Sequence, residues 1–138
     1  LHVTGDTFFG GNVREKVTIS ATAATGTVNF DAITQSVLYY TTNASGNWTL
    51  NVRGDGSTTL NSIMATGDSL TIAFLVTQGS TAYYQATFKV DGSAVTPKYA
   101  GGSAPSAGNI NGIDGYAMTI IKTGDAAFTA LGALTEFG

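Results

Sequence analysis

The sequence predicts an all-β protein, an antiparallel β-sandwich of jelly-roll-like topology with about eight strands and one short helical turn. Short runs of alternating apolar and polar residues recur along the chain, which is typical of half-buried strands. Clusters of Gly, Asn, Asp and Ser separate these runs, and the 18 glycines disfavour long helices. Because each such strand has one apolar face to bury, we expect two packed sheets.

Four strands are expected in the first part of the chain. Each shows apolar alternation over a few residues, and turn-forming residues such as those at 43–46 lie between them. The predicted strands cover residues 16–20, 27–30, 36–41 and 48–52.

Residues 57–67 interrupt the strand pattern. Their apolar residues are spaced by three and four and a glycine closes the run, which predicts one or two helical turns. The strongest strand signals follow at 70–76 and 84–90, on either side of the turn-like residues 78–81. We expect these two runs to pair as a long hairpin.

Two further strands complete the predicted set, at residues 116–122 and 127–131. Turn chemistry marks residues 91–93 and 123–125, where Asp and Gly tolerate tight backbone conformations. Residues 100–112 are rich in Gly, Ser, Ala and Asn and predict a long exposed loop.

The first residues differ from the rest of the chain, because short apolar alternation lies between closely spaced glycines. We interpret residues 1–11 as a tether or as the end of a repetitive β shaft. Residues 12–138 then form the sandwich domain.

The composition predicts a lightly charged surface. Charged residues make up 11% of the chain, less than half of the share of about 25% that is usual in soluble domains. Such a surface is better suited to contact with another protein subunit than to full exposure to solvent. The six Lys and Arg residues are scattered and the net charge is −3, so we expect no nucleic-acid partner. No apolar run approaches the roughly 20 residues of a membrane span, so we expect no membrane insertion.

The residues needed for catalysis are scarce. Cysteine is absent and His2 is the one histidine, so a nucleophile activated by a histidine is not expected. Most of the nine acidic residues lie in or near turn signals, where they cap backbone amides. Asp55 and Asp91 begin Asp-Gly-Ser turns but lack the ligand spacing of a calcium loop. We expect no enzyme activity, no cofactor and no metal site.

Two short motifs have structural explanations. Arg53, Gly54 and Asp55 form an Arg-Gly-Asp tripeptide, which a strand ending before a Gly-containing turn produces without any binding role. Asn43 and Asn47 begin glycosylation sequons, to which we assign no function.

Aromatic side chains are the candidate ligand or interface residues. In adjacent pairs such as Tyr39 and Tyr40, the strand period of two sends one ring to each face of a sheet. The exposed rings could stack on sugars, although packing within the core or at a subunit interface is the favoured interpretation. The candidates are Tyr39, Tyr40, Trp48, Tyr83, Tyr84 and Tyr99.

Several long strings resemble a domain that recurs in virion structural proteins of T4-like cyanophages and other marine tailed phages. They are NWTLNVRGDGSTTLNSIM at 47–64, AFLVTQGSTAYY at 73–84 and SAVTPK at 93–98, with further likeness at 13–20, 116–123 and 128–137. In that family the domain follows Gly-rich repeats of the form Val-x-Gly-x-x-x-Phe, which Val3 to Phe9 matches once.

The resemblance implies a particle component located in the virion, assembled in the host cytoplasm with other virion proteins, and it implies no site residues. Together with the low charge, it favours an exposed terminal domain of a trimeric fibre or whisker. A capsid-surface decoration protein and a module that binds a host-surface glycan are the two alternatives.

Overall fold

The computed structural model describes residues 2–138, so Leu1 of the predicted tether lies outside the described residues. This part of the chain contains ten strands, one short α-helix and one 3-10 turn. The elements are β1 (Val17–Ala23), β2 (Gly26–Asp31), β3 (Val37–Thr42), β4 (Trp48–Arg53), α1 (Leu60–Ile63), β5 (Ser69–Thr77), β6 (Gln85–Val90), β7 (Ser93–Ala94), β8 (Lys98–Tyr99), η1 (Ala100–Gly102), β9 (Ile113–Gly124) and β10 (Ala127–Phe137).

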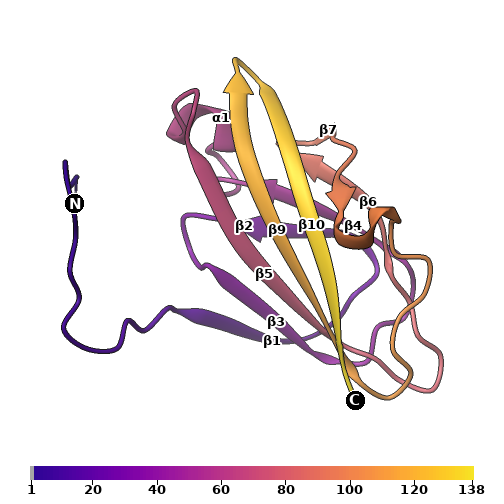
Figure 1. Cartoon of the computed structure of the whole chain (residues 1–138). Coiled ribbons are helices and arrows are strands. Elements are labelled where there is room, and N and C mark those ends of the chain that lie inside the picture. Colours follow the sequence, from indigo (N-terminus) through magenta and orange to yellow (C-terminus); the bar gives the residue numbers. More distant parts are fainter. Residues whose placement is uncertain (1) are drawn as a thin grey trace.

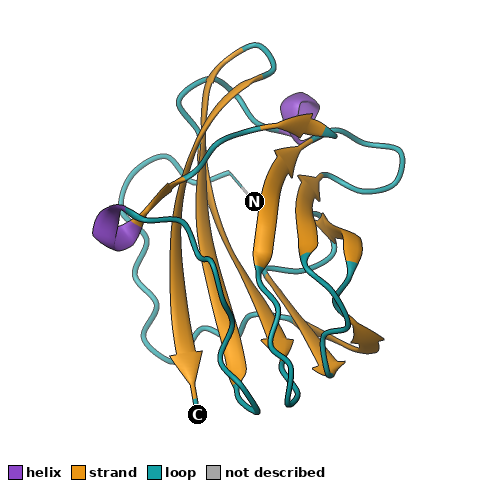
Figure 2. Cartoon of the chain, turned by 90° about the vertical axis from the view of Figure 1, so that its right-hand side faces the viewer, coloured by secondary structure: helices purple, strands orange, loops and turns teal. Residues whose placement is uncertain are grey.

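The strands form two packed sheets, as the sequence predicts (Figure 1, Figure 2). A six-stranded sheet has the order β1-β3-β5-β9-β10-β8, and a four-stranded sheet has the order β2-β4-β6-β7. From β1 to β6 the chain alternates between the two sheets, so that each strand lies beside the strand two positions later. The first six strands therefore wind as a flattened coil of parallel strands, and the β9–β10 hairpin extends the six-stranded sheet beyond β5.

The predicted antiparallel, jelly-roll-like arrangement is wrong. Five of the eight strand pairings are parallel, and jelly rolls are built from antiparallel pairs. The predicted hairpin of 70–76 with 84–90 is wrong as well, because β5 and β6 belong to different sheets. Alternation along a strand shows that one face is buried, but it does not show whether the next segment turns back or crosses the sandwich.

One apolar core lies between the sheets. Trp48 of β4 is 1% exposed, and its ring contacts Phe74 and Tyr116 of the opposite sheet with centroid distances of 6.0 and 5.5 Å. Both contacts are edge-to-face, the geometry that aromatic quadrupoles prefer. Trp48 thus joins the two sheets at the centre of the molecule.

The predicted helical turn is confirmed as α1, and a half-buried carboxylate and a buried ammonium fix its two ends. At its beginning, the Asp91 carboxylate accepts hydrogen bonds from the amides of Leu60 and Asn61, at 2.7 and 2.9 Å. At its end, the Lys122 ammonium donates to the carbonyl oxygens of Asn61 and Met64, at 2.6 and 2.8 Å. The loop between β4 and β5 is therefore held against β6 and β9.

The turns predicted at 91–93 and 123–125 connect true hairpins. Asp91 and Gly92 both have positive φ, at 50° and 80°, between β6 and β7. Two positive φ values are what the twist of a two-residue hairpin requires. The β9–β10 turn places Ala126 at φ 48°, a conformation that favours glycine.

Residues 2–16 form no helix or strand, and the segment extends away from both sheets (Figure 1). The first strand begins at Val17, and the boundary predicted at residue 12 lies within this extended segment. Within the described chain, no helix has the length and apolar character to cross a membrane.

Candidate interaction surface

The six-stranded sheet has an outer face, turned away from the core, that carries no charged side chain on β1, β3, β5, β9 or β10. We call this surface the uncharged outer face. It consists of Val17, Ile19, Ala21, Val37, Tyr39, Thr41, Ser69, Thr71, Ala73, Leu75, Thr77, Ile113, Gly115, Ala117, Thr119, Ile121, Thr123, Ala127, Thr129, Leu131, Ala133, Thr135 and Phe137.

Strand register brings the small and apolar residues into rows across the sheet. One row runs through Val17, Val37, Ala73, Ala117 and Ala133, which pair successively from β1 to β10. The neighbouring row runs in the same way from Ile19 of β1 to Thr135 of β10. Side chains in such rows are direct neighbours, so the surface is continuous over five strands.

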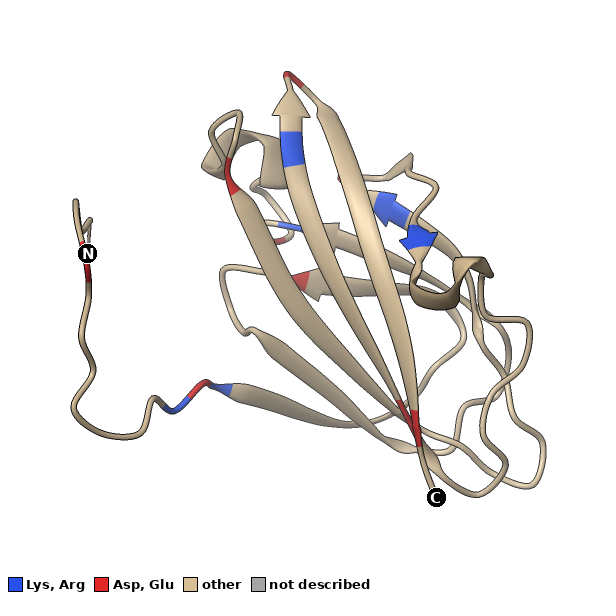
Figure 3. Ribbon diagram, in the orientation of Figure 1, with Lys and Arg blue, Asp and Glu red and all other residues tan. Residues whose placement is uncertain are grey.

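The charged residues of these strands occupy inward-facing positions or lie near strand ends. Asp114 and Lys122 of β9 are buried, because they occupy the inward-facing positions of that strand. Lys98 of β8 lies beside Leu131 and marks the far rim of the sheet. In Figure 3, the strands β5, β9 and β10 face the viewer and are free of charge over their middle.

Glycine shapes the part of this face near the end of the chain. A Cβ atom on Gly115 would lie 3.1 Å from the Phe137 ring and 3.4 Å from Leu75. The ring of Phe137 can therefore lie across β9, and 55% of it remains exposed. A shallow hollow of about 190 Å³ is lined there by Leu75, Gly115 and Phe137 among others.

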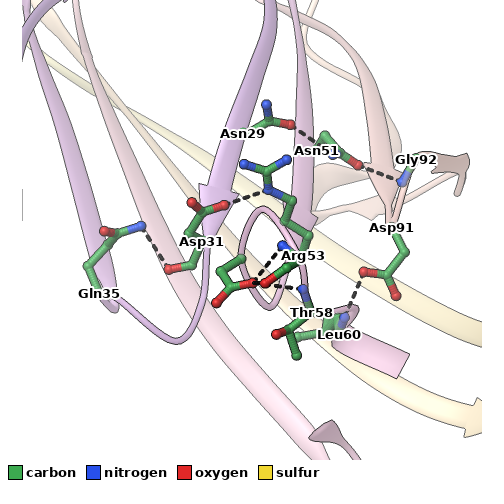
Figure 4. A network of polar contacts seen from close by, with 11 residues as sticks. Asn29, Asp31, Gln35, Asn51, Arg53, Thr58, Leu60, Asp91 and Gly92 are labelled. Carbon is green, nitrogen blue, oxygen red and sulfur yellow. Dashed lines mark hydrogen bonds and ion pairs between the residues drawn. The ribbon is translucent and has the colours of Figure 1, made fainter. Parts of the chain in front are cut away.

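The outer face of the four-stranded sheet has the opposite character, because its outward positions are polar and form a network (Figure 4). Asn51 donates to Asn29 at 2.9 Å and accepts from the Gly92 amide at 2.8 Å. Arg53 donates to Asp31 at 2.7 Å, which links the ends of two parallel strands. Through these hydrogen bonds, the polar side chains hold β2, β4 and the β6–β7 turn together.

The Arg-Gly-Asp tripeptide belongs to this network and is the structural turn that the sequence predicts. Asp55 accepts from the amides of Ser57 and Thr58 at 2.8 and 2.7 Å, and the Ser57 bond is the main cause that lowers its pKa. A Cβ atom on Gly54 would lie 2.7 Å from the Thr58 carbonyl oxygen, so the loop requires glycine there. Arg53 is engaged by Asp31.

The aromatic candidates on β3 and β4 do not form a common platform. Tyr40 points inward and meets Phe74 edge-on at 5.2 Å, whereas Tyr39 lies on the uncharged outer face. This division confirms that the adjacent tyrosines occupy opposite faces of the sheet. Trp48 is enclosed by the core, so its ring faces cannot stack on a sugar.

The remaining three candidates are half-buried. Tyr83 packs against the core, and Gln78 donates to its carbonyl oxygen at 2.6 Å. The Tyr84 amide donates to Asn47 at 3.1 Å. The Tyr99 hydroxyl accepts from Gln85 at 3.0 Å, and its ring lies against Gly132.

Sequence reasoning missed the uncharged outer face as a unit. The signal was present in the alternation of residues 115–121 and 127–135, where Ala, Gly, Thr, Leu and Ile occupy every second position without a charge. Recognising the surface also requires the register between strands far apart in the sequence. Among residues 2–138, no group of three or more His, Cys, Asp or Glu side chains could hold a metal ion.

The fold and this surface define a two-sheet all-β domain with one polar and one uncharged face. The chain matches no protein-family model, and no curated protein or solved structure reaches significant similarity to it.

Proposed function

We propose that this chain is a non-enzymatic virion structural protein of a tailed phage, forming the exposed terminal domain of a trimeric fibre or whisker. The uncharged outer face is the surface that packs against sister subunits. The virion setting and the trimer rest on the family resemblance, and the face supplies the physical basis for assembly.

The observation that carries the proposal is the difference between the two outer faces. Charged side chains at Asp31, Arg53 and Lys89 lie on the outward positions of the four-stranded sheet. None lies on β1, β3, β5, β9 or β10 of the uncharged outer face. Depletion of charge at the centre of a surface distinguishes buried subunit interfaces from ordinary solvent-exposed surface.

Small side chains make the uncharged outer face suitable for another sheet. Ala73, Ala117 and Ala133 leave the middle of the surface low, while Ile19 and Leu131 stand at its sides and are 68% and 45% exposed. Two sheets pack with their side chains interdigitated, so a low centre with bulkier rims can accept a partner of complementary relief.

Immunogold labelling of purified particles of a phage that encodes this chain tests the proposal. We expect an antibody against the domain to label tail or neck appendages. An even coat over the capsid would instead identify a decoration protein, and absence of label from intact and disrupted particles would contradict any virion role.

A further inference from the structure

The edge strands of the two sheets differ in length between the two sides of the sandwich. On one side, the edge strands β7 and β8 have only two residues each. On the other side, the edges are β1 with seven residues and β2 with six. Natural sheets protect their edges with short strands, charges or proline, because a long free edge is a template for another strand.

The β1 edge has few of these protections. Residues Val17–Ala23 contain no charged residue and no proline. Its first four residues pair in regular parallel register with residues 37–40 of β3, and their opposite edge has no neighbouring strand in the sheet. Val17 and Ile19 are also exposed on this strand. The edge therefore offers free backbone groups beside apolar side chains.

Exposed apolar side chains concentrate at this side of the molecule. Among residues 2–138, eleven large hydrophobic residues are exposed, and seven of them lie within residues 3–33. Phe8 is 92% exposed and Phe9 is 65% exposed, both in the extended segment of residues 2–16. The seven residues are Val3, Phe8, Phe9, Val13, Val17, Ile19 and Ile33.

The extended segment is able to reach a neighbouring molecule. Residues 2–16 make no backbone hydrogen bond to the two sheets and point away from them (Figure 1). Fifteen extended residues span about 50 Å, whereas a compact domain of this size has a radius of gyration of about 14 Å. The segment can thus cross a whole adjacent domain.

We propose that residues 2–16 of one copy add as a strand to the free β1 edge of a second copy, with Phe8 and Phe9 covering the apolar side chains there. Strand addition satisfies the free amide and carbonyl groups of β1 and buries the phenylalanines in one step. Each copy gives a segment at one place and receives one at another, so three copies can close into a ring. This exchange uses an edge of the sandwich, so it goes beyond the proposed packing of the uncharged outer face.

Cross-linking tests the proposal, because the chain contains no cysteine. A tagged full chain carrying Thr7→Cys is mixed with an untagged full chain carrying Ala21→Cys on β1, and a short thiol-specific cross-linker is added. We expect a heterodimer at twice the 14.1 kDa of one chain. The matched control is Ala94→Cys, an exposed alanine on the opposite edge strand β7, which should give no heterodimer.

A second variant tests the role of the phenylalanines. The pair Phe8→Ser and Phe9→Ser should abolish the heterodimer, whereas Ile63→Ser and Ile110→Ser, exposed elsewhere on the domain, should leave it unchanged. A chain with both Thr7→Cys and Ala21→Cys that links only within itself would overturn the proposal, as would equal linking to Ala94→Cys. Neither result would depend on where the domain lies on a particle.

Discussion

Ala126 occupies a backbone conformation that costs an alanine free energy, because at φ 48° its Cβ atom crowds the following carbonyl. Replacing it with glycine removes this strain. Glycine also raises the conformational entropy of the unfolded chain, which offsets part of the stabilisation. We expect Ala126→Gly to raise the free energy of unfolding by about 0.5–1 kcal/mol. Urea unfolding measures it. Ala127→Gly, at the neighbouring position without a positive φ, should lower stability instead.

Tyr116 makes stability depend on pH at the alkaline end. Burial raises the pKa of its phenol well above the ordinary value of about 10, and burial also raises the pKa of Tyr40 and Tyr99. Above about pH 10 the unfolded chain loses these protons and the folded chain keeps them, so stability falls as pH rises. The expected slope is up to about 1.4 kcal/mol per pH unit for Tyr116, and solvent screening makes the contributions of Tyr40 and Tyr99 smaller.

Tyr116→Phe should reduce that slope in urea unfolding between pH 8 and 11. It should also lower stability at neutral pH by about 1–3 kcal/mol, because the Gln85 amide loses its acceptor at 3.1 Å. Tyr39→Phe, on the uncharged outer face, is the matched control. An unchanged slope in Tyr116→Phe would show that this phenol ionises equally in both states.

At the scale of elements, the loop that contains α1 depends on Lys122. The buried ammonium is the donor to two carbonyl oxygens that end the helical turn. Lys122→Met keeps the apolar stem and removes these bonds, so we expect a loss of about 1–3 kcal/mol in stability. Lys98→Met, at an exposed position, should change stability by less than about 0.5 kcal/mol. Equal effects would contradict a structural role for Lys122.

Several elements could be predicted because their signal is local. The strand predicted at 70–76 lies within β5, the one at 48–52 lies within β4, and the helical turn at 57–67 encloses α1. The pairing could not be predicted, because residues 78–81 look like a hairpin turn, whereas the chain from β5 to β6 crosses between the two sheets. The two-residue strands β7 and β8 carry too few residues for any periodic signal.

At the scale of the whole molecule, a charge in the middle of the uncharged outer face should prevent association. Ala117 lies on this face and is exposed, so Ala117→Lys can be accommodated in the monomer. A buried, unpaired ammonium is costly at an interface. We expect sedimentation velocity to show a trimer for the wild-type chain and a larger share of 14.1 kDa monomer for the variant at the same concentration.

The matched control for this experiment is Thr87→Lys, an exposed position on β6 of the four-stranded sheet, which should leave the trimer intact. Equal dissociation by both variants would remove the uncharged outer face as the interface. A wild-type chain that is monomeric at micromolar concentration would contradict the trimer itself.

The candidate surface could be predicted only in part. The low charge indicated a packed neighbour, and that expectation stays a prediction. The location could not be derived, because Ala73, Ala117 and Ala133 become neighbours only through pairings between residues 44 and 16 positions apart. The choice of six aromatic residues as candidate ligand residues has a different weakness. An aromatic side chain alone does not show whether the residue lies in the core, as Trp48 does, or on the surface, as Tyr39 does.

The alternation of the first strands between the two sheets makes every pairing among them one between segments far apart in the sequence. Only β6–β7 and β9–β10 pair through a short turn, whereas Val37 of β3 pairs with Val17 of β1 and with Ala73 of β5, which lie 20 and 36 positions away in the sequence. Long-range parallel pairing forms slowly, because the entropy cost of closing the intervening loop precedes the hydrogen bonds that compensate for it. We expect the sheet to grow from its C-terminal hairpin towards β1, opposite to the direction of synthesis. Nascent chains arrested before β10 should therefore remain sensitive to protease along their whole length.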